Sequence, residues 1–216
     1  MKISAFEKKL GHAFRDPSLL ERALTHSSFA YEAPERSPGD NEVLEFLGDS
    51  VLGLVVADFV CEAYPGRPEG ELSKLKAAVA STIGLADLAL KVKLDKLVRL
   101  GKGEEKSGGR KKKTILAGGF EAVMGAVYLD AGYEAARRVL RPHLESAFMK
   151  LKNSPVVINN YKSALQEHFQ KREAPPPFYR SLDSAGPDHR KEFKVEVTHE
   201  GRVPARASGP SKKAAE

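Results

Sequence analysis

The pattern of apolar positions predicts a mostly helical chain over the first 150 residues. Apolar side chains recur at helical spacing in the segments 17–24, 41–61, 72–80, 83–91, 115–129 and 134–152. Asp16 and Pro17 mark the start of the first helix, because Asp is a favoured N-cap and proline is tolerated at the first helical position. Residues 31–40, rich in proline, glycine and charge, are expected to form a loop.

The pattern changes after a predicted linker at 152–158, so we place a domain boundary there. A helix over 161–172 precedes three predicted strands at 178–183, 192–198 and 202–207, and a last helix begins at Ser211. The middle strand alternates polar and apolar residues, which predicts that Phe193, Val195 and Val197 face inward. The fold class expected is an all-α domain over residues 1–152 followed by a small α+β domain over residues 159–216.

The predicted helix at 41–61 carries three acidic residues on one stripe. At about 100° per residue, Glu42, Glu45 and Asp49 lie within roughly 60° of one another, and the other directions are apolar. The apolar surroundings predict a buried helix, in which an ionised carboxylate costs several kcal/mol unless a positive charge compensates it. The segment contains no such partner, so the stripe indicates a divalent cation, for carboxylates usually Mg²⁺ or Mn²⁺.

A second helix that is apolar on all sides, 115–129, contains one acid within its apolar body, Glu121. If the two helices face each other, Glu121 and the acidic stripe converge on one cavity. The sequence suggests neither a Ser-His-Asp or Cys-His arrangement nor a phosphate-binding loop of the Walker type. Attack of metal-activated water on a phosphodiester is the reaction that such a site suits.

The net charge of +6 is unevenly distributed. Residues 99–113 contain seven Lys or Arg against two acids, and residues 151–216 contain twelve against eight, so the remainder of the chain is acidic. Two basic zones beside an acidic centre favour a polyanionic partner, although charge alone is equally compatible with ordinary solubilising surface. The glycine-rich basic segment 101–113 is expected to be a loop that approaches phosphates closely.

No segment predicts a membrane or secretory location. The longest apolar run, 51–57, is far shorter than a bilayer span, and the first residues contain no apolar signal region. The single cysteine, Cys61, excludes an internal disulfide framework and fits a reducing compartment. We therefore expect a cytoplasmic protein without membrane partners.

The ten residues 41–50 closely resemble the signature of the ribonuclease III family. The agreement extends to the segments 23–28, 69–73, 100–104 and 120–122, and residues 159–216 resemble a double-stranded RNA-binding domain. The resemblance implies a homodimeric, all-helical nuclease that cuts double-stranded RNA with Mg²⁺, or Mn²⁺ as a substitute. It further implies 5′-phosphate and 3′-hydroxyl ends, and a role in processing ribosomal RNA precursors and messenger RNA.

The resemblance also assigns roles to individual residues. Asp49, Glu121 and Glu42 match catalytic positions, and Glu45, Asp49 and Glu121 match metal ligands. Glu69 matches an assisting acid. Phe46 matches an aromatic residue at the family's dimer interface, with a core side chain as the alternative. The residues that match RNA contacts are Lys102, Lys106, Arg110, Lys111, Gln166, Glu167, His189, Lys212 and Lys213.

Two departures from the family pattern bear on function. Gly118 occupies a position where the family usually has an acid, three residues before Glu121. The missing ligand predicts weaker metal affinity and reduced cleavage, and it leaves open a catalytically weakened protein that only binds double-stranded RNA. The last helix of the RNA-binding domain is cut short at Glu216, which leaves the middle strand poorly covered and predicts either a marginal domain or a shortened reading frame. His26, in the segment 23–28, is expected to be a helix cap or core-edge residue, with a catalytic role as the alternative.

Overall fold

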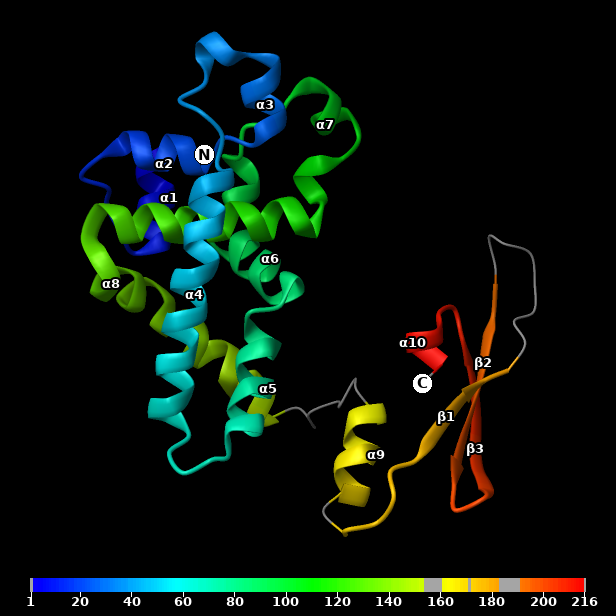
Figure 1. Cartoon of the computed structure of the whole chain (residues 1–216). Coiled ribbons are helices and arrows are strands. Elements are labelled where there is room, and N and C mark those ends of the chain that lie inside the picture. Colours follow the sequence, from blue (N-terminus) through cyan, green and yellow to red (C-terminus); the bar gives the residue numbers. More distant parts are fainter. Residues whose placement is uncertain (1, 154–160, 171, 183–190, 216) are drawn as a thin grey trace. The chain divides into compact units, whose positions relative to one another are not determined.

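The computed structural model describes residues 2–153, 161–170, 172–182 and 191–215 (Figure 1). The chain divides into two compact units, Met1–Asn153 and Ser154–Glu216. The described part of the first unit is helical and that of the second contains a small sheet, so the predicted fold class is confirmed.

The first unit is built around the contact between two long helices, α4 and α8, which cross in Figure 1. Smaller helices surround this pair. The bounds are α1 Ile3–Leu10, α2 Pro17–Ala23, α3 Ser27–Glu32, η1 Pro34–Arg36, α4 Glu42–Ala63, α5 Glu69–Val79, α6 Thr82–Lys91, η2 Leu94–Lys96, α7 Lys102–Lys106, η3 Gly109–Lys111 and α8 Lys113–Asn153. The predicted cap of α2 is present, because the Asp16 carboxylate accepts a hydrogen bond from the Ser18 amide at 2.9 Å.

Helix α8 contains a break at Gly132, whose φ of 78° and ψ of −175° are not helical. The apolar pattern predicted this break, since it placed separate helices at 115–129 and 134–152. The first part of α8 is the core of the unit: Phe120, Val123 and Met124 are completely buried. The segment Lys113–Met149 is long and apolar enough to cross a membrane, but 61% of its most apolar window is buried within the protein, as is usual for the core helix of a globular domain.

Helix α4 differs from the prediction, because it is not buried on all sides. Val43, Phe46 and Leu54 are 62%, 78% and 58% exposed, whereas Val55 and Val56 on the opposite side are buried at 1%. The apolar residues that encircle α4 therefore serve two purposes: one side fills the core, and the other leaves an apolar face open on the single chain.

Two segments expected to be loops contain short helices. Residues 31–40 include the end of α3 and the 3₁₀ turn η1, which starts at a proline compatible with the first helical position. Residues 101–113 include α7 and η3. The segment is ordered by Arg110, whose guanidinium donates to the carbonyl oxygens of Asp95 at 2.7 Å and Val98 at 3.0 Å. Because these two acceptors lie far from Arg110 in the sequence, no local pattern predicts the contacts that order the segment.

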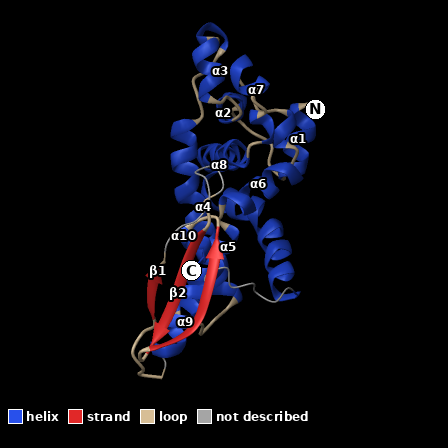
Figure 2. Ribbon diagram, turned by 90° about the vertical axis from the view of Figure 1, so that its right-hand side faces the viewer, coloured by secondary structure: helices blue, strands red, loops and turns tan. Residues whose placement is uncertain are grey.

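The second unit contains an antiparallel sheet in the order β1-β2-β3 (Figure 2). Its elements are α9 Tyr161–Gln170, β1 Phe178–Ser181, β2 Phe193–His199, β3 Arg202–Gly209 and α10 Lys212–Ala215. Phe178 lies opposite Thr198, and Phe193 lies opposite Gly209. The rings of Phe169 and His199 are 4.0 Å apart between centroids, which places α9 against β2.

The middle strand β2 is better covered than predicted. Val195 is only 2% exposed, and Phe193 and Val197 are half-buried. The cover includes α10, which contacts both β2 and β3 and buries Ala215 at 5% exposure. Gly209 permits this approach, because a Cβ there would lie 2.8 Å from the Ala215 amide nitrogen. Helix α10 thus contributes to the burial of the centre of the strand.

Candidate active site

The close crossing of α4 and α8 brings the predicted acids together. A Cβ at Gly48 would overlap the carbonyl oxygen of Glu121, and a Cβ at Gly125 would overlap that of Leu44. Each helix therefore presents a glycine to the backbone of the other, which lets the two axes approach more closely than side chains would allow. The crossing places Glu121 of α8 directly beside the turn of α4 that carries the acidic stripe.

A cavity of about 410 Å³ opens at this crossing and is lined by Glu42, Glu45, Phe46, Asp49 and Glu121. The four acids that the sequence placed in one site thus line one cavity. Glu42 and Asp49 are exposed, whereas Glu45 and Glu121 are half-buried. Burial of the acidic stripe was predicted, and it holds for one of its three members only, because the stripe faces an open cavity and not the core.

The site has an excess of negative charge. Burial, and then the charges of Glu45 and Asp49, raise the pKa of Glu121 to about 7. Burial also raises the pKa of Glu45, followed by the charge of Glu42, with His26 opposing and Asp49 adding to the shift. Among the residues that the structure describes, no ion pair joins these carboxylates to a Lys or Arg side chain. Among the described residues, the acids are therefore held close together without an ion pair to a Lys or Arg, and only the charge of His26 opposes the shift of Glu45.

The donor set fits a hard divalent cation. It consists of carboxylate oxygens alone, which suit Mg²⁺ or Mn²⁺ and not metals that prefer nitrogen or sulfur. In the described part of the chain, no group of three or more Asp, Glu, His or Cys side chains is arranged so that it could hold a metal ion as the side chains stand. An open, acid-lined cavity is still compatible with Mg²⁺, because this ion keeps several of its waters and needs few protein ligands.

Gly118 lies directly at this site. A Cβ there would stand 2.5 Å from Oε2 and 2.8 Å from Oε1 of Glu45. The Glu45 carboxylate therefore lies against the α8 backbone, in space that a side chain at position 118 would need. Position 118 is thus adjacent to the acids. Glycine at this position leaves space for Glu45, whereas an acid would add a potential metal ligand.

Two further residues that the sequence assigned to the site, Glu69 and Phe46, differ in their position from the four acids. Glu69 is the first residue of α5, where it accepts a hydrogen bond from the Ser73 hydroxyl at 2.6 Å, and it does not line the cavity of the single chain. Its assisting role stays a prediction. Phe46 is 78% exposed at the cavity edge, so the alternative of a core side chain is wrong for the single chain.

The basic segment around α7 presents some of its charges to solvent and uses others internally. Lys102, Lys106 and Lys111 are exposed. Arg110 pairs with Glu105 at 2.5 Å in addition to its two carbonyl acceptors, and Lys112 pairs with Glu104 at 2.7 Å. Arg110 was expected to contact RNA, but its guanidinium maintains the segment, and an RNA contact would have to replace these bonds.

The RNA contacts predicted in the second unit are only partly described. Gln166 on α9 and Lys212 at the start of α10 are exposed. His189 lies outside the described residues, as do the side chains of Glu167 and Lys213. The predicted contacts of these residues with RNA stay predictions.

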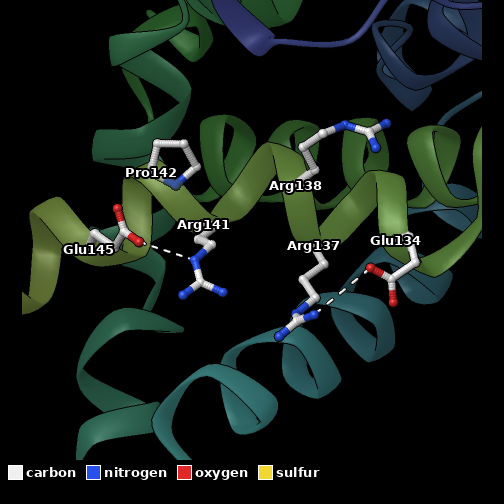
Figure 3. Close-up of a pocket in the computed structure, with 6 residues that line it drawn as sticks. All are labelled: Glu134, Arg137, Arg138, Arg141, Pro142 and Glu145. Carbon is white, nitrogen blue, oxygen red and sulfur yellow. Dashed lines mark hydrogen bonds and ion pairs between the residues drawn. The ribbon is translucent and has the colours of Figure 1, made fainter. Parts of the chain in front are cut away.

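Another cavity, of about 360 Å³, lies along the later part of α8 (Figure 3). It was not predicted from the sequence. Arg137 and Arg141 of this cavity are already compensated. Arg137 pairs with Asp58 at 3.1 Å and Glu62 at 2.8 Å, and Arg141 pairs with Glu62 at 2.9 Å and Glu145 at 3.1 Å. The sequence signal for this network is the i, i+4 spacing of two acids on α4 and of two arginines on α8. This network joins α4 to α8 and is structural.

The folds and the site together define a class: a helical domain with an acid-lined cavity, joined to a small nucleic-acid-binding domain. A family model described as Ribonuclease-III-like matches residues 16–147, and one described as Double-stranded RNA binding motif matches residues 161–216. The chain therefore belongs to the ribonuclease III family, whose members are endoribonucleases that hydrolyse double-stranded RNA.

Curated relatives and solved structures agree with this assignment. Ribonuclease 3 of Nitratiruptor sp. is 43% identical over 215 residues, covering 100% of this chain and 92% of the relative. Ribonuclease 3 of Solibacter usitatus is 46% identical, covering 97% of this chain and 81% of the relative. The nuclease domain of ribonuclease III from Campylobacter jejuni superimposes with a TM-score of 0.63 at 37% identity, covering 68% of this chain and 99% of that one.

Proposed function

We propose that the acid-lined cavity is a Mg²⁺-dependent centre that cleaves double-stranded RNA, leaving 5′-phosphate and 3′-hydroxyl ends. The observation that carries this proposal is the convergence of Glu42, Glu45, Asp49 and Glu121 on one cavity without a compensating Lys or Arg among the described residues. Uncompensated charge costs stability, so its presence at an open cavity favours a cation-dependent function.

Glu45, Asp49 and Glu121 are the residues that would hold the cation. When bound, it supplies charge neutralisation at the phosphate and a lowered pKa of coordinated water. In the hydrolysis, a water oxygen bonds to phosphorus and the water gives up a proton, the bond from phosphorus to the 3′ oxygen breaks, and the 3′ oxygen takes up a proton. Glu42, which is exposed and lines the cavity, would accept a hydrogen bond from the attacking water.

We also propose that two copies of the chain associate through the open apolar face of α4, defined by Val43, Phe46 and Leu54. Three large apolar side chains beside a cavity are typical of an interface. The solved structure from Campylobacter jejuni is described as having a region involved in dimer formation in its nuclease domain. A homodimer would carry two cavities, one for each strand of a duplex.

The biological setting follows from the family and stays a proposal: a cytoplasmic enzyme that acts on ribosomal RNA precursors and messenger RNA. The matched double-stranded RNA binding motif supports a duplex substrate.

A second candidate function is binding of double-stranded RNA with little cleavage. The observation that favours it is Gly118, which leaves the cavity without a side chain at a position that touches Glu45. The retained set of four acids argues for cleavage, because a protein that only binds gains nothing from clustering like charges.

A gel assay of a long RNA duplex, with Mg²⁺ and with a chelator, separates the two candidates. The proposed nuclease converts the duplex to short products only when Mg²⁺ is present. The 5′ ends of these products should be substrates for a 5′-phosphate-dependent exonuclease. Binding of the duplex without any Mg²⁺-dependent shortening would favour the second candidate.

A further inference from the structure

His26 caps helix α3 with only one of its two ring nitrogens. Nδ1 accepts a hydrogen bond from the Ser28 amide at 3.2 Å and lies 2.8 Å from the Ser28 hydroxyl. That hydroxyl in turn accepts from the Gly101 amide at 3.0 Å. The Ser28 hydroxyl proton is therefore directed to Nδ1, and the cap expected from the sequence is confirmed.

This arrangement fixes the tautomer of the ring. A backbone amide can only donate, so Nδ1 must be an acceptor, and the proton of the neutral imidazole resides on Nε2. Nε2 has no hydrogen-bond partner among the described residues, although the ring is half-buried. The cap thus leaves a single oriented N–H donor that the fold itself does not use.

His26 is near enough to both the acidic cavity and the basic segment that begins at Gly101 to act on an acid of each. Its electrostatic influence reaches both sides, since a charge on His26 would lower the pKa of Glu45 and of Glu104. Glu104 belongs to α7, which is tied to α3 by a second set of bonds: the Glu32 carboxylate accepts from the amides of Lys102 at 2.7 Å and Gly103 at 3.2 Å.

These contacts hold α3 and the start of α7 in a fixed position relative to each other. A Cβ at Gly101 would lie 2.5 Å from Oε1 of Glu32 and 2.6 Å from the carbonyl oxygen of Ser28. The position of His26 is therefore coupled to that of the exposed Lys102 and Lys106. An RNA strand that contacts these lysines and the acidic cavity would therefore lie near the imidazole.

We propose that His26 is an RNA-contacting residue of this nuclease, whose Nε2–H donates a hydrogen bond to a phosphate oxygen of the strand that enters the cavity. This inference rests on the proposed cleavage of double-stranded RNA. The imidazole is suited to this role, because Ser28 holds Nδ1 and leaves the Nε2–H directed away from the cap, where it can donate to an anionic oxygen.

Two substitutions separate the two ring nitrogens. His26→Asn keeps an acceptor near the position of Nδ1, and Asn is among the best N-caps, but it removes the distal donor. His26→Gln places an N–H near the position of Nε2 and weakens the cap. We expect His26→Asn to retain the thermal midpoint of the wild type to within about 2 °C. Its kcat/KM should fall about tenfold to a hundredfold, as for loss of a hydrogen bond to a charged group.

His26→Gln should show the converse: a lower thermal midpoint, with a kcat/KM well above that of His26→Asn at a temperature where both variants are folded. Wild-type kcat/KM in His26→Asn would overturn the proposal and leave the ring as a cap only. If His26→Asn fails to fold, His26→Gln is compared with His26→Ala, since both lose the cap and differ in the donor. Equal kcat/KM in this pair would also overturn it.

The wild type is assayed in parallel, so that failure of the proposed function can be distinguished from failure of the proposed role of His26. Absence of Mg²⁺-dependent cleavage by the wild type itself would reject the proposed function. Normal cleavage by the wild type together with unchanged cleavage by His26→Asn would reject the role of His26 alone.

Discussion

Helix α4 meets helix α8 through acidic residues at both of its ends, with opposite consequences. Near its C-terminal end, Glu62 lies 2.8 Å from Arg137 and 2.9 Å from Arg141. Hydrogen bonding and charge from Arg141, the larger influence, and from Arg137 lower the pKa of Glu62. Near the N-terminal end, the residue that α8 offers to the stripe is another acid, Glu121, and its pKa rises to about 7.

The two ends of this helix pair therefore have different roles: one stabilises the fold, and the other forms the candidate active site. The salt-bridged end joins the later part of α8 to α4 by opposite charges. The cavity end brings like charges together and depends on Gly48 and Gly125 to hold the backbones close. Charge that the fold leaves uncompensated is available for a cation and a substrate.

The largest effect is expected for Glu121→Gln, which removes charge at the cavity end while keeping the side chain's shape. Cleavage of an RNA duplex should fall on the order of a thousandfold, comparable with the loss of a group that stabilises a transition state electrostatically. The thermal midpoint should stay the same or rise, because a destabilising charge is lost. The matched control is Glu62→Gln, which should cleave normally and melt slightly earlier; a similar loss of cleavage in both variants would refute the contrast.

The backbone contact is tested by Gly48→Ala. The added methyl group would overlap the Glu121 carbonyl oxygen, so the helices must separate, and we expect a loss of about 3 kcal/mol in unfolding free energy. Chemical denaturation measures this loss. Gly53→Ala on the same helix is the control, since its Cβ would make an ordinary contact at 3.7 Å with Lys76 Nζ. It should gain up to about 1 kcal/mol from higher helix propensity. Equal stabilities of the two variants would show that the crossing is looser than described.

The number of carboxylates is tested by Gly118→Asp, with Gly118→Asn as the uncharged control of similar size. A fifth carboxylate at the cavity, beside Glu45, should raise Mg²⁺ affinity about tenfold, or about 1.4 kcal/mol, and lower the Mg²⁺ concentration needed for cleavage. Glu45 has to shift, because the new Cβ would lie 2.5 Å from its Oε2, but this is the flexible end of a side chain. Unchanged Mg²⁺ dependence and rate in Gly118→Asp would show that position 118 does not limit the site.

The raised pKa of Glu121 predicts a smaller effect on stability as a function of pH. Its folded-state pKa of about 7 exceeds the ordinary value of 4.5, so the folded state binds the proton more tightly. Stability of the metal-free protein should therefore fall as pH rises from 4.5 through about 7. Burial lowers the pKa of His143, which opposes this trend over part of the range.

The contribution of Glu121 is obtained from the thermal midpoint of the wild type minus that of Glu121→Gln at each pH. His143 contributes equally to both proteins and cancels. The difference should become more negative between pH 5 and 7 and then level off. A difference that does not change with pH would mean that Glu121 is ionised throughout, and that the cavity is more hydrated than its geometry indicates.

The sequence alone located the acidic site because helical periodicity places Glu42, Glu45 and Asp49 on one stripe, and because Glu121 interrupts an otherwise apolar helix. It overestimated the burial of α4. Apolar residues on all sides of a helix are equally compatible with a core and with a surface for a second chain, and periodicity does not distinguish them.

Contacts between distant residues were the part that could not be predicted. The roles of Arg110 and Arg137 depend on partners in other elements, and the approach permitted by Gly48 depends on the path of α8. The same holds for His26, for which the sequence predicted a cap, whereas the free Nε2 emerged only once the bonds to Ser28 were known.

Calorimetric titration of Mg²⁺ into the protein without RNA tests whether the acidic cavity holds a cation, because it measures binding and not the reaction. Wild type and Glu62→Gln should bind Mg²⁺ with the same affinity, and Glu121→Gln should bind it at least about tenfold more weakly. Equal affinity in all three proteins would contradict the account, since the charge at the cavity end of α4 and α8 would then have no part in holding a cation.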